Sequence, residues 1–125
     1  MELVGRGEVI VKEILHELMP NAEITTQVPL YNLLMPDKRL ALSERQHKET
    51  IDIVVNRKFK KTLCVRIQDK HHYSKRFGQI DGVQRAHLEQ SYNEVLDIYE
   101  HECPNIFKAK LGAKDELLFY LRPYL

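Results

Sequence analysis

Two stretches in the middle of the chain show the hydrophobic patterning of β-strands. The first covers residues 50–56 and the second residues 62–68, and a basic connection of hairpin length joins them. Each stretch is apolar on one face and carries polar side chains on the other. The pattern predicts two neighbouring strands, with Asp52 near the start of the first, and with Arg66 and Gln68 near the end of the second.

Two other stretches carry apolar residues at the spacing of an α-helix. Residues 5–19 are predicted as a first helix, and residues 79–101 as the longest helix. The apolar face of the longer one consists of Leu88, Tyr92, Val95, Leu96 and Tyr99. Pro20 and Pro104 follow the two helices, and we interpret both prolines as helix stops.

The remaining segments complete an α/β pattern. A β-prone run at residues 22–30 and a short one at 105–110 are predicted strands, whereas residues 31–48 begin with a helical turn and continue as a polar, mobile loop. Residues 115–125 fit either a helix or a strand. The order helix, strand, strand, strand, helix, strand predicts a central mixed β-sheet flanked by helices, within one domain that covers residues 1–125.

Composition narrows the class of protein. Hydrophobic residues make up 43% of the chain and charged residues 30%, as in soluble globular proteins. No apolar run approaches the ~20 residues of a membrane span, and the N-terminus lacks the pattern of a signal peptide. The two cysteines form no recognised motif. We therefore expect a cytoplasmic protein without a membrane partner.

The net charge of +1 hides an uneven distribution of charge. The segment 57–76 contains one acid, Asp69, and the basic residues Arg57, Lys58, Lys60, Lys61, Arg66, Lys70, Lys75 and Arg76. A basic face of this kind favours contact with a polyanion such as nucleic acid. A lysine-rich turn that prevents edge-to-edge aggregation of the sheet fits the same residues, and both interpretations stay open.

The motifs resemble those of the PD-(D/E)xK restriction-endonuclease-like superfamily. Gly5-Arg6-Gly7-Glu8 resembles the start of archaeal Holliday-junction resolvases, and Ile51-Asp52 resembles the superfamily's strand-borne aspartate. The run Ile67-Gln68-Asp69-Lys70-His71-His72 is similar to the very-short-patch-repair-like branch. The resemblance implies a restriction-endonuclease-like fold and a Mg²⁺ or Mn²⁺ ion held by Asp52, Gln68 and Glu8.

Two alignments of the (D/E)xK element remain open. In the first, Arg66 stands where the second acid belongs and Gln68 where the lysine belongs. In the second, Gln68-Asp69-Lys70 is a QxK variant, in which Gln68 is a neutral metal ligand and Lys70 the catalytic lysine. The second alignment supplies the predicted catalytic set of Asp52, Gln68, Lys70 and Glu8. The predicted nucleic-acid contacts are Arg66, His71, His72, Lys75, Arg76 and Lys58.

Three hypotheses follow from these residues. The first is a metal-dependent endonuclease that cuts phosphodiester bonds in DNA, for which branched or mismatched DNA is the substrate class that the resemblance implies. The second is a degenerate nuclease fold that binds nucleic acid without cutting it, because Arg66 occupies the position of an acid. The third is a dimeric regulatory protein whose apolar C-terminal end, with Tyr120, Pro123, Tyr124 and Leu125, packs across a two-fold axis of a homodimer.

Overall fold

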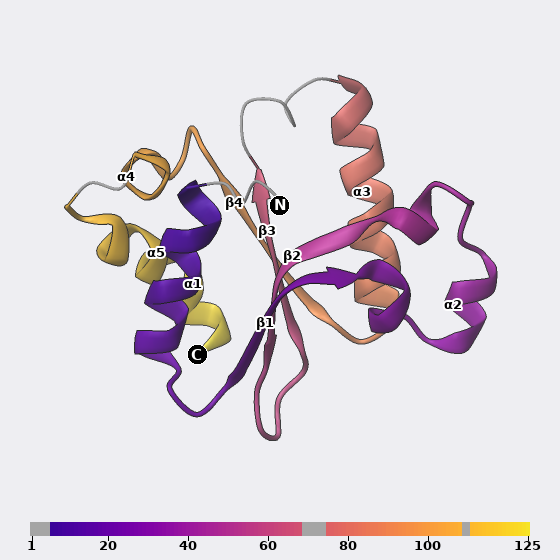
Figure 1. Cartoon of the computed structure of the whole chain (residues 1–125), viewed down its shortest axis with the longest axis horizontal. Helices are drawn as coiled ribbons and strands as arrows, with labels where there is room; N and C mark the ends of the chain where they lie inside the picture. The colour runs from indigo at the N-terminus through magenta and orange to yellow at the C-terminus, as the bar shows by residue number, and fades with distance from the viewer. Residues whose placement is uncertain (1–5, 69–74, 109–110) are drawn as a thin grey trace.

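Four strands form one mixed sheet, which Figure 1 shows nearly edge-on between two groups of helices. The structure is a computed structural model that describes residues 6–68, 75–108 and 111–125, and it leaves out the side chains of Arg6 and of residues 75–81. The strands β1 (Glu23–Pro29), β2 (Thr50–Asn56), β3 (Leu63–Gln68) and β4 (Glu94–Tyr99) lie in the spatial order β1-β2-β3-β4. β1 and β3 are both antiparallel to β2, whereas β4 is parallel to β3.

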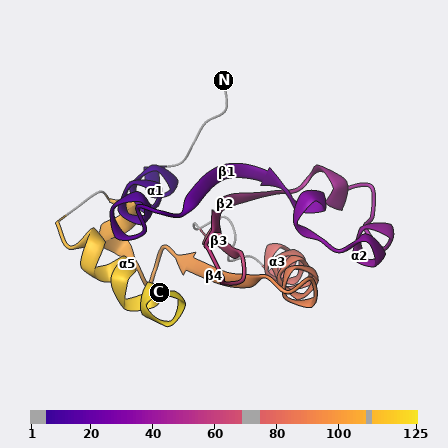
Figure 2. The same cartoon turned by 90° about the horizontal axis from the view of Figure 1, so that it is seen from below.

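Helices cover both faces of this sheet, so the predicted α/β class with a mixed sheet between helices is confirmed. On one face lie α1 (Arg6–Leu18), α4 (Pro104–Phe107) and α5 (Ala113–Leu121), and on the other lies α3 (Lys75–Gln90), as Figure 2 shows from below. The first core cluster joins α1 and α5 to the strands through residues such as Leu15, Val65 and Leu117. The second joins α3 to the opposite face through Leu88, Cys64 and Val54.

The prediction that a helix and then a strand follow β3 was right, but the predicted bounds of both elements were wrong. Residues 79–101 are not one helix, because α3 ends at Gln90 and β4 begins at Glu94. The predicted strand at 105–110 is also wrong, since α4 covers Pro104–Phe107. Pro104 is the first residue of α4 rather than the stop of a preceding helix, a position where its missing N–H costs no hydrogen bond.

The segment between β1 and β2 is folded onto the sheet, contrary to the predicted mobile loop. It contains the 3₁₀ turns η1 (Leu30–Leu33) and η2 (Gln46–Lys48) and the short helix α2 (Pro36–Leu40). Its apolar residues Leu30, Leu34 and Leu42 are buried in the second core cluster. Hydrophobic burial therefore holds this segment in place, although its exposed positions are mostly polar.

The sheet is distorted where β1 and β2 pass Gln27 and Asp52. Thr26 pairs with Ile53 and Val28 with Ile51, so Gln27 and Asp52 lie opposite one another in the ladder. Gln27 has a φ of 51°, in the left-handed region that a residue with a Cβ adopts at a cost of about 1–2 kcal/mol. Ile51 packs in the second core cluster and Ile53 in the first, although regular alternation would place both on one face. Asp52 thus lies at a local break in the sheet.

Candidate functional site

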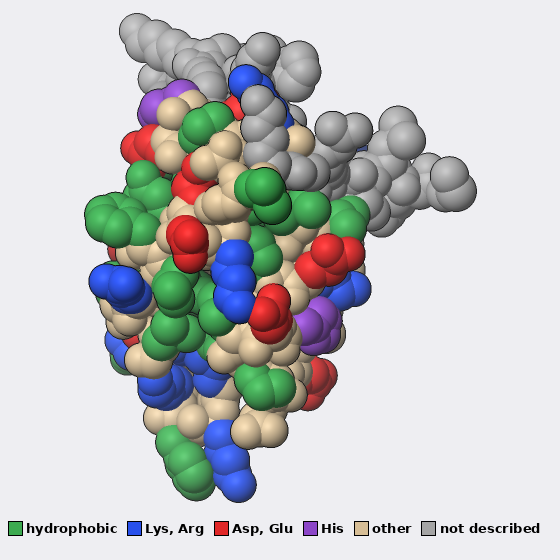
Figure 3. All heavy atoms as spheres, turned by 90° about the vertical axis from the view of Figure 1, so that its left-hand side faces the viewer, with side chains coloured by type: hydrophobic (Ala, Val, Ile, Leu, Met, Phe, Trp, Pro, Cys, Tyr) green, Lys and Arg blue, Asp and Glu red, His purple; other side chains and the backbone are tan. Residues whose placement is uncertain are grey.

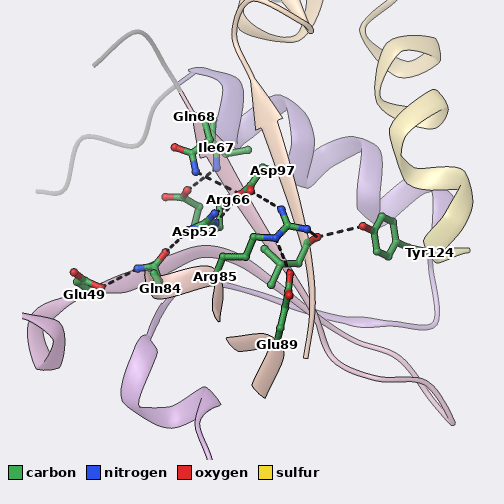
Figure 4. A network of polar contacts seen from close by, with 11 residues as sticks. Glu49, Asp52, Arg66, Ile67, Gln68, Gln84, Arg85, Glu89, Asp97 and Tyr124 are labelled. Carbon is green, nitrogen blue, oxygen red and sulfur yellow. Dashed lines mark hydrogen bonds and ion pairs between the residues drawn. The ribbon is translucent and has the colours of Figure 1, made fainter. Parts of the chain in front are cut away.

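Asp52 lies at the head of β2, beside the C-terminal end of β3. Ladder pairing between β2 and β3 is formed from Val55 and Leu63 to Ile53 and Val65. Beyond this pair the contact is made by the Asp52 side chain, whose Oδ2 accepts a hydrogen bond of 2.8 Å from the backbone N–H of Ile67. Figure 4 shows Asp52 close to the side chains of Arg66 and Gln68. The structure thus brings together these three predicted site residues.

Arg66 forms a buried ion pair with Asp97 of β4. The two residues are register partners in the parallel β3–β4 ladder. The Arg66 Nε lies 2.6 Å from Asp97 Oδ1 and the Arg66 Nη2 lies 2.9 Å from Oδ2, and the side chains are only 5% and 4% exposed. This bidentate geometry is the strong form of an arginine–carboxylate pair. The predicted role of Arg66 as a phosphate contact remains a prediction, but its guanidinium already binds a carboxylate inside the protein.

Further polar contacts extend from this pair toward the surface (Figure 4). Arg85 of α3 donates from Nη1 to Asp97 Oδ2 at 2.7 Å and from Nε to Glu89 at 2.6 Å. Gln84 accepts from Arg66 Nη1 at 3.1 Å and donates to Glu49 at 3.1 Å. The charges of Arg66 and Arg85 are therefore balanced by two carboxylates, those of Asp97 and Glu89.

The electrostatics of Asp97 follow from these neighbours. Burial favours its neutral form, but hydrogen bonds and positive charge from Arg66, together with the charge of Arg85, outweigh burial and hold the pKa of Asp97 below its usual value of 3.8. Gln68 adds a hydrogen bond, because its Nε2 lies 3.4 Å from Asp97 Oδ1. Since the amide nitrogen of Gln68 is turned toward Asp97, its carbonyl oxygen, the atom that binds cations, is turned away from that carboxylate.

Glu8, from the first turn of α1, is connected to the head of β2 through Gln27. Its side chain is buried, with 6% exposure, and its Oε1 accepts a hydrogen bond of 3.0 Å from Gln27 Nε2. The Oε1 of Gln27 in turn accepts from the hydroxyl of Thr50 at 2.9 Å. These two hydrogen bonds join α1 to β2 at Thr50, two residues before Asp52.

Gly7 allows α1 to lie close to α4 and β3, because a Cβ there would lie 3.2 Å from the ring of Phe107 and 3.5 Å from Ile67.

The other predicted site residues divide into three groups. Lys70, His71 and His72 lie outside the described residues. Lys75 and Arg76 open α3, and their side chains lie outside the described part as well. Lys58 is exposed in the turn between β2 and β3, at the opposite end of these strands from Asp52. Lys58 therefore belongs to a different part of the surface from the Asp52 site.

The described residues fit only an open metal site. Within residues 6–68, 75–108 and 111–125, no three His, Cys, Asp or Glu side chains form a group that could hold a metal ion. Magnesium, however, is commonly held by one or two carboxylates together with substrate phosphates and waters. Asp52 supplies one carboxylate and Gln68 an amide carbonyl, which meets this minimum. Two oxygen donors match an ion that waters or a phosphate complete, and Gln68, at 2% exposure, would hold such an ion below the protein surface.

Sequence reasoning missed Asp97, Gln84 and Arg85 because residues 94–99 were assigned to a helix. With residues 94–99 as a strand parallel to β3, the opposite charges of Arg66 and Asp97 become ladder partners. The signal was present in the β-prone run Val95-Leu96-Asp97-Ile98-Tyr99, which follows the helix-breaking residues Ser91-Tyr92-Asn93.

The predicted dimer contact at the C-terminal end also has an internal alternative, since Tyr120 and Tyr124 pack against the first core cluster.

Comparison with known proteins adds no relative. Neither a protein-family model, nor a curated protein, nor a solved structure matches the chain significantly. Within the described part of the chain, the longest helices are too short or too polar to cross a lipid bilayer. The fold and the site define a mixed α/β domain with an acidic residue and an amide at the junction of two central strands.

Proposed function

We propose that this protein is a divalent-metal-dependent nuclease that hydrolyses phosphodiester bonds in DNA at a site centred on Asp52 and Gln68. The observation that carries the proposal is the position of the Asp52 carboxylate, which binds the backbone of Ile67 and lies beside Gln68. An acid at the head of one strand, next to an amide oxygen at the end of its neighbour, could hold the metal ion that phosphodiester hydrolysis of this kind uses.

The ion pair of Arg66 removes the main objection to this proposal. An uncompensated arginine beside Asp52 would repel a cation and would also neutralise the one carboxylate of the site. Asp97 instead holds the guanidinium through two hydrogen bonds of 2.6 and 2.9 Å, with both side chains buried. The position of the second acid is therefore electrically near neutral, which favours the alignment in which Gln68, rather than Arg66, belongs to the site.

The chain's own residues would divide the work as follows. Asp52 and Gln68 would hold the metal ion through oxygen atoms, and the ion would polarise the phosphoryl group and the attacking water. Glu8, whose Oε1 accepts a hydrogen bond from Gln27, remains the predicted third metal ligand and a member of the catalytic set. Lys70 remains the proposed catalytic lysine of the QxK alignment, in which its ammonium group would stabilise developing negative charge.

A cleavage assay with an Asp52→Asn variant tests the proposal. Supercoiled plasmid, linear duplex and a four-way junction would be incubated with Mg²⁺ or Mn²⁺ and resolved on gels. Because metal assistance contributes several kcal/mol, Asp52→Asn should slow cleavage by about 1000-fold. The exposed Asp115 of α5 provides the matched control, since Asp115→Asn makes the same chemical change away from the site. Cleavage by Asp52→Asn at the wild-type rate, or no wild-type cleavage of any substrate, would refute catalysis at Asp52.

A second function, binding of nucleic acid without cleavage, is favoured by one observation. Arg66 stands where the resembled motif has its second acid, which leaves the site one carboxylate fewer with which to hold a metal ion. A protein of this kind would bind DNA without a metal requirement, and Asp52→Asn would leave its affinity unchanged. Binding measured by fluorescence anisotropy in the presence of a chelator separates this function from the nuclease.

A further inference from the structure

The turn between β2 and β3 projects an aromatic ring into solvent from a cationic tip. Phe59 is 97% exposed and has a φ of 63°, a left-handed conformation that is unusual for a residue with a bulky side chain. Figure 1 shows this turn extending beyond the helices at the lower end of the sheet. Lys58, Lys60 and Lys61 around it are exposed, and the Lys58 Nζ lies 5.5 Å from the centre of the Phe59 ring. An exposed ring on a left-handed residue, among three lysines, contributes little to folding.

The base of the turn is held firmly in place by Arg57. Its guanidinium donates to the backbone oxygen of Tyr124, to that of Lys61 at 2.6 Å and to Glu94 Oε2 at 2.8 Å. Its side chain is only 7% exposed. Thr62 adds a hydrogen bond of 3.2 Å to Asn56 across the strand ends. The tip is therefore presented on a fixed support, which lowers the entropic cost of binding a partner.

A cleft lies next to this turn and shares its lysines. It has a volume of about 540 Å³ and lies between the turn, the C-terminal end of α1 and the last residues of the chain. Met19, Ala22 and Tyr124 contribute apolar wall, and Lys58 and Lys60 contribute positive charge. Figure 3 shows Lys and Arg side chains gathered toward the lower end of this face of the molecule. Residues 57–62 contain no acid that would offset the lysines.

We propose that the tip of the β2–β3 turn binds single-stranded nucleic acid, with Phe59 stacking on an unpaired base and Lys58, Lys60 and Lys61 contacting the adjoining phosphates. Cationic surface that follows a backbone, combined with an exposed aromatic ring, is the chemistry by which unpaired strands are held without sequence preference. This inference deepens the proposed function and rests on its premise that the chain acts on nucleic acid. It assigns to the substrate an unpaired segment, as in a flap, a bubble or a branch.

The fluorescence of a tryptophan placed at the tip measures stacking on a base directly, because stacking quenches it. The chain contains six tyrosines and no tryptophan, so Phe59→Trp creates a single tryptophan at the proposed contact, which can be excited selectively at wavelengths that tyrosine does not absorb. Phe119, which is 69% exposed on α5, gives the matched control Phe119→Trp at a second aromatic surface position. Titration with the oligonucleotide dT12 should quench Phe59→Trp and leave Phe119→Trp unchanged. Phe59→Ala should weaken binding of dT12 by about 5- to 160-fold, the range that corresponds to loss of one base–aromatic stack.

Charge removal gives an independent measurement. Each phosphate contact adds about 0.7 to the slope of log affinity against log salt for single strands. Replacement of Lys58, Lys60 and Lys61 by Gln should therefore reduce that slope by about 2. Lys108→Gln, at an exposed position after α4, removes a charge elsewhere and should leave the slope unchanged within error.

Three outcomes would overturn the inference. Phe59→Trp fluorescence that does not respond to dT12 is one, and equal quenching of both tryptophan variants is another. The third is a blue shift of Phe59→Trp on vesicles of phosphatidylglycerol without any response to dT12, which would assign the tip to an anionic membrane surface. Failure of the nuclease proposal is distinguishable: wild type would cut no substrate while Phe59→Trp was still quenched by dT12.

Discussion

Removal of the Asp97 carboxylate is the sharpest test of the polar network behind the candidate site. In an Asp97→Ala variant the Arg66 guanidinium, which is 5% exposed, would lose two of its charge-assisted hydrogen bonds while it remained buried. Breaking a buried ion pair by removing one partner costs about 3–5 kcal/mol. Because a domain of this size is stable by about 5–15 kcal/mol, we expect Asp97→Ala to lose a large fraction of its stability.

The loss can be measured by urea denaturation followed by far-ultraviolet circular dichroism. With a slope of about 2 kcal/mol per molar urea, the midpoint should fall by roughly 2 M. Glu89→Gln is the matched control, because Glu89 also pairs with Arg85, at 2.6 Å, but is 50% exposed. An exposed pair of residues four apart on a helix contributes about 0.3–0.5 kcal/mol, so the control should barely move the midpoint.

A double variant tests whether Arg66 is the reason for the loss. When Arg66→Met is combined with Asp97→Ala, neither member of the buried ion pair carries a charge any longer. The second substitution should therefore restore part of the stability that Asp97→Ala loses alone. Equal midpoints for Asp97→Ala and Glu89→Gln would contradict the buried pair. So would a double variant whose loss equals the sum of the two single losses.

Two further predictions follow from the ionisation states of buried groups. Because the pKa of Asp97 is lowered in the folded state, its contribution to stability is complete above the usual pKa of 3.8 and is lost as the pH falls from there through the folded pKa. Asp97→Asn should remove that part of the acid dependence in urea titrations at several pH values, and an unchanged profile would contradict the assignment. Burial raises the pKa of both Cys64 and Cys103 to about 12. A thiol reagent at pH 8 should therefore label neither thiol in the folded protein and both in urea, and rapid labelling of the folded protein would refute this.

The first half of the fold could be predicted because local pattern and tertiary environment agree there. The predicted helix 5–19 and strands 22–30, 50–56 and 62–68 correspond to Arg6–Leu18, Glu23–Pro29, Thr50–Asn56 and Leu63–Gln68. Five of the six residues of β3 and four of the seven of β2 are buried, and both strands contribute to both core clusters, so the predicted polar face on each strand was wrong. Their strand length and the basic turn of hairpin length between them still indicated two strands. The helical spacing of α1 directs Val11, Ile14 and Leu15 into one core cluster, as expected for an amphipathic helix.

The bounds of α3 and β4 were predicted wrongly because apolar residues of the helix and of the strand together fit a single helical spacing. Leu88, Val95 and Leu96 fit one helical face by spacing, yet Leu88 belongs to α3, and Val95 and Leu96 face opposite sides of β4. β4 is buried on both faces, so it lacks the strict alternation that marks a half-exposed strand. Tyr92, which follows the end of α3, has a φ of 64°, a left-handed conformation that glycine usually adopts after a helix. Because a tyrosine stands at this position, no glycine in the sequence signalled the end of the helix.

The candidate site was predicted in part for a related reason. Asp52 and Gln68 could be located because their strands were predicted within one residue of the observed bounds, although the alternation along β2 breaks at Asp52 itself. The partner of Arg66 could not, because a buried ion pair depends on which strand lies beside β3, and that strand had been assigned to a helix. Local sequence therefore indicated that Arg66 faces the same side as Gln68, but tertiary pairing with Asp97 decides what the charge of Arg66 does there.

The two proposed contact regions lie at opposite ends of the same strand pair, and this separation makes their tests independent. Asn56 lies four residues after Asp52 in β2, a distance of about 13 Å at 3.3 Å per residue, and the exposed tip lies beyond that point. Substitution of Phe59 therefore removes no contact of Asp52, and Asp52→Asn leaves the lysines of the tip in place. If Phe59→Ala lowers cleavage only at limiting substrate while Asp52→Asn lowers it at saturation, the tip contributes to binding and Asp52 to the chemical step. Equal losses for both variants under both conditions would instead mean that the tip and the site act as one unit, which their separation along β2 argues against.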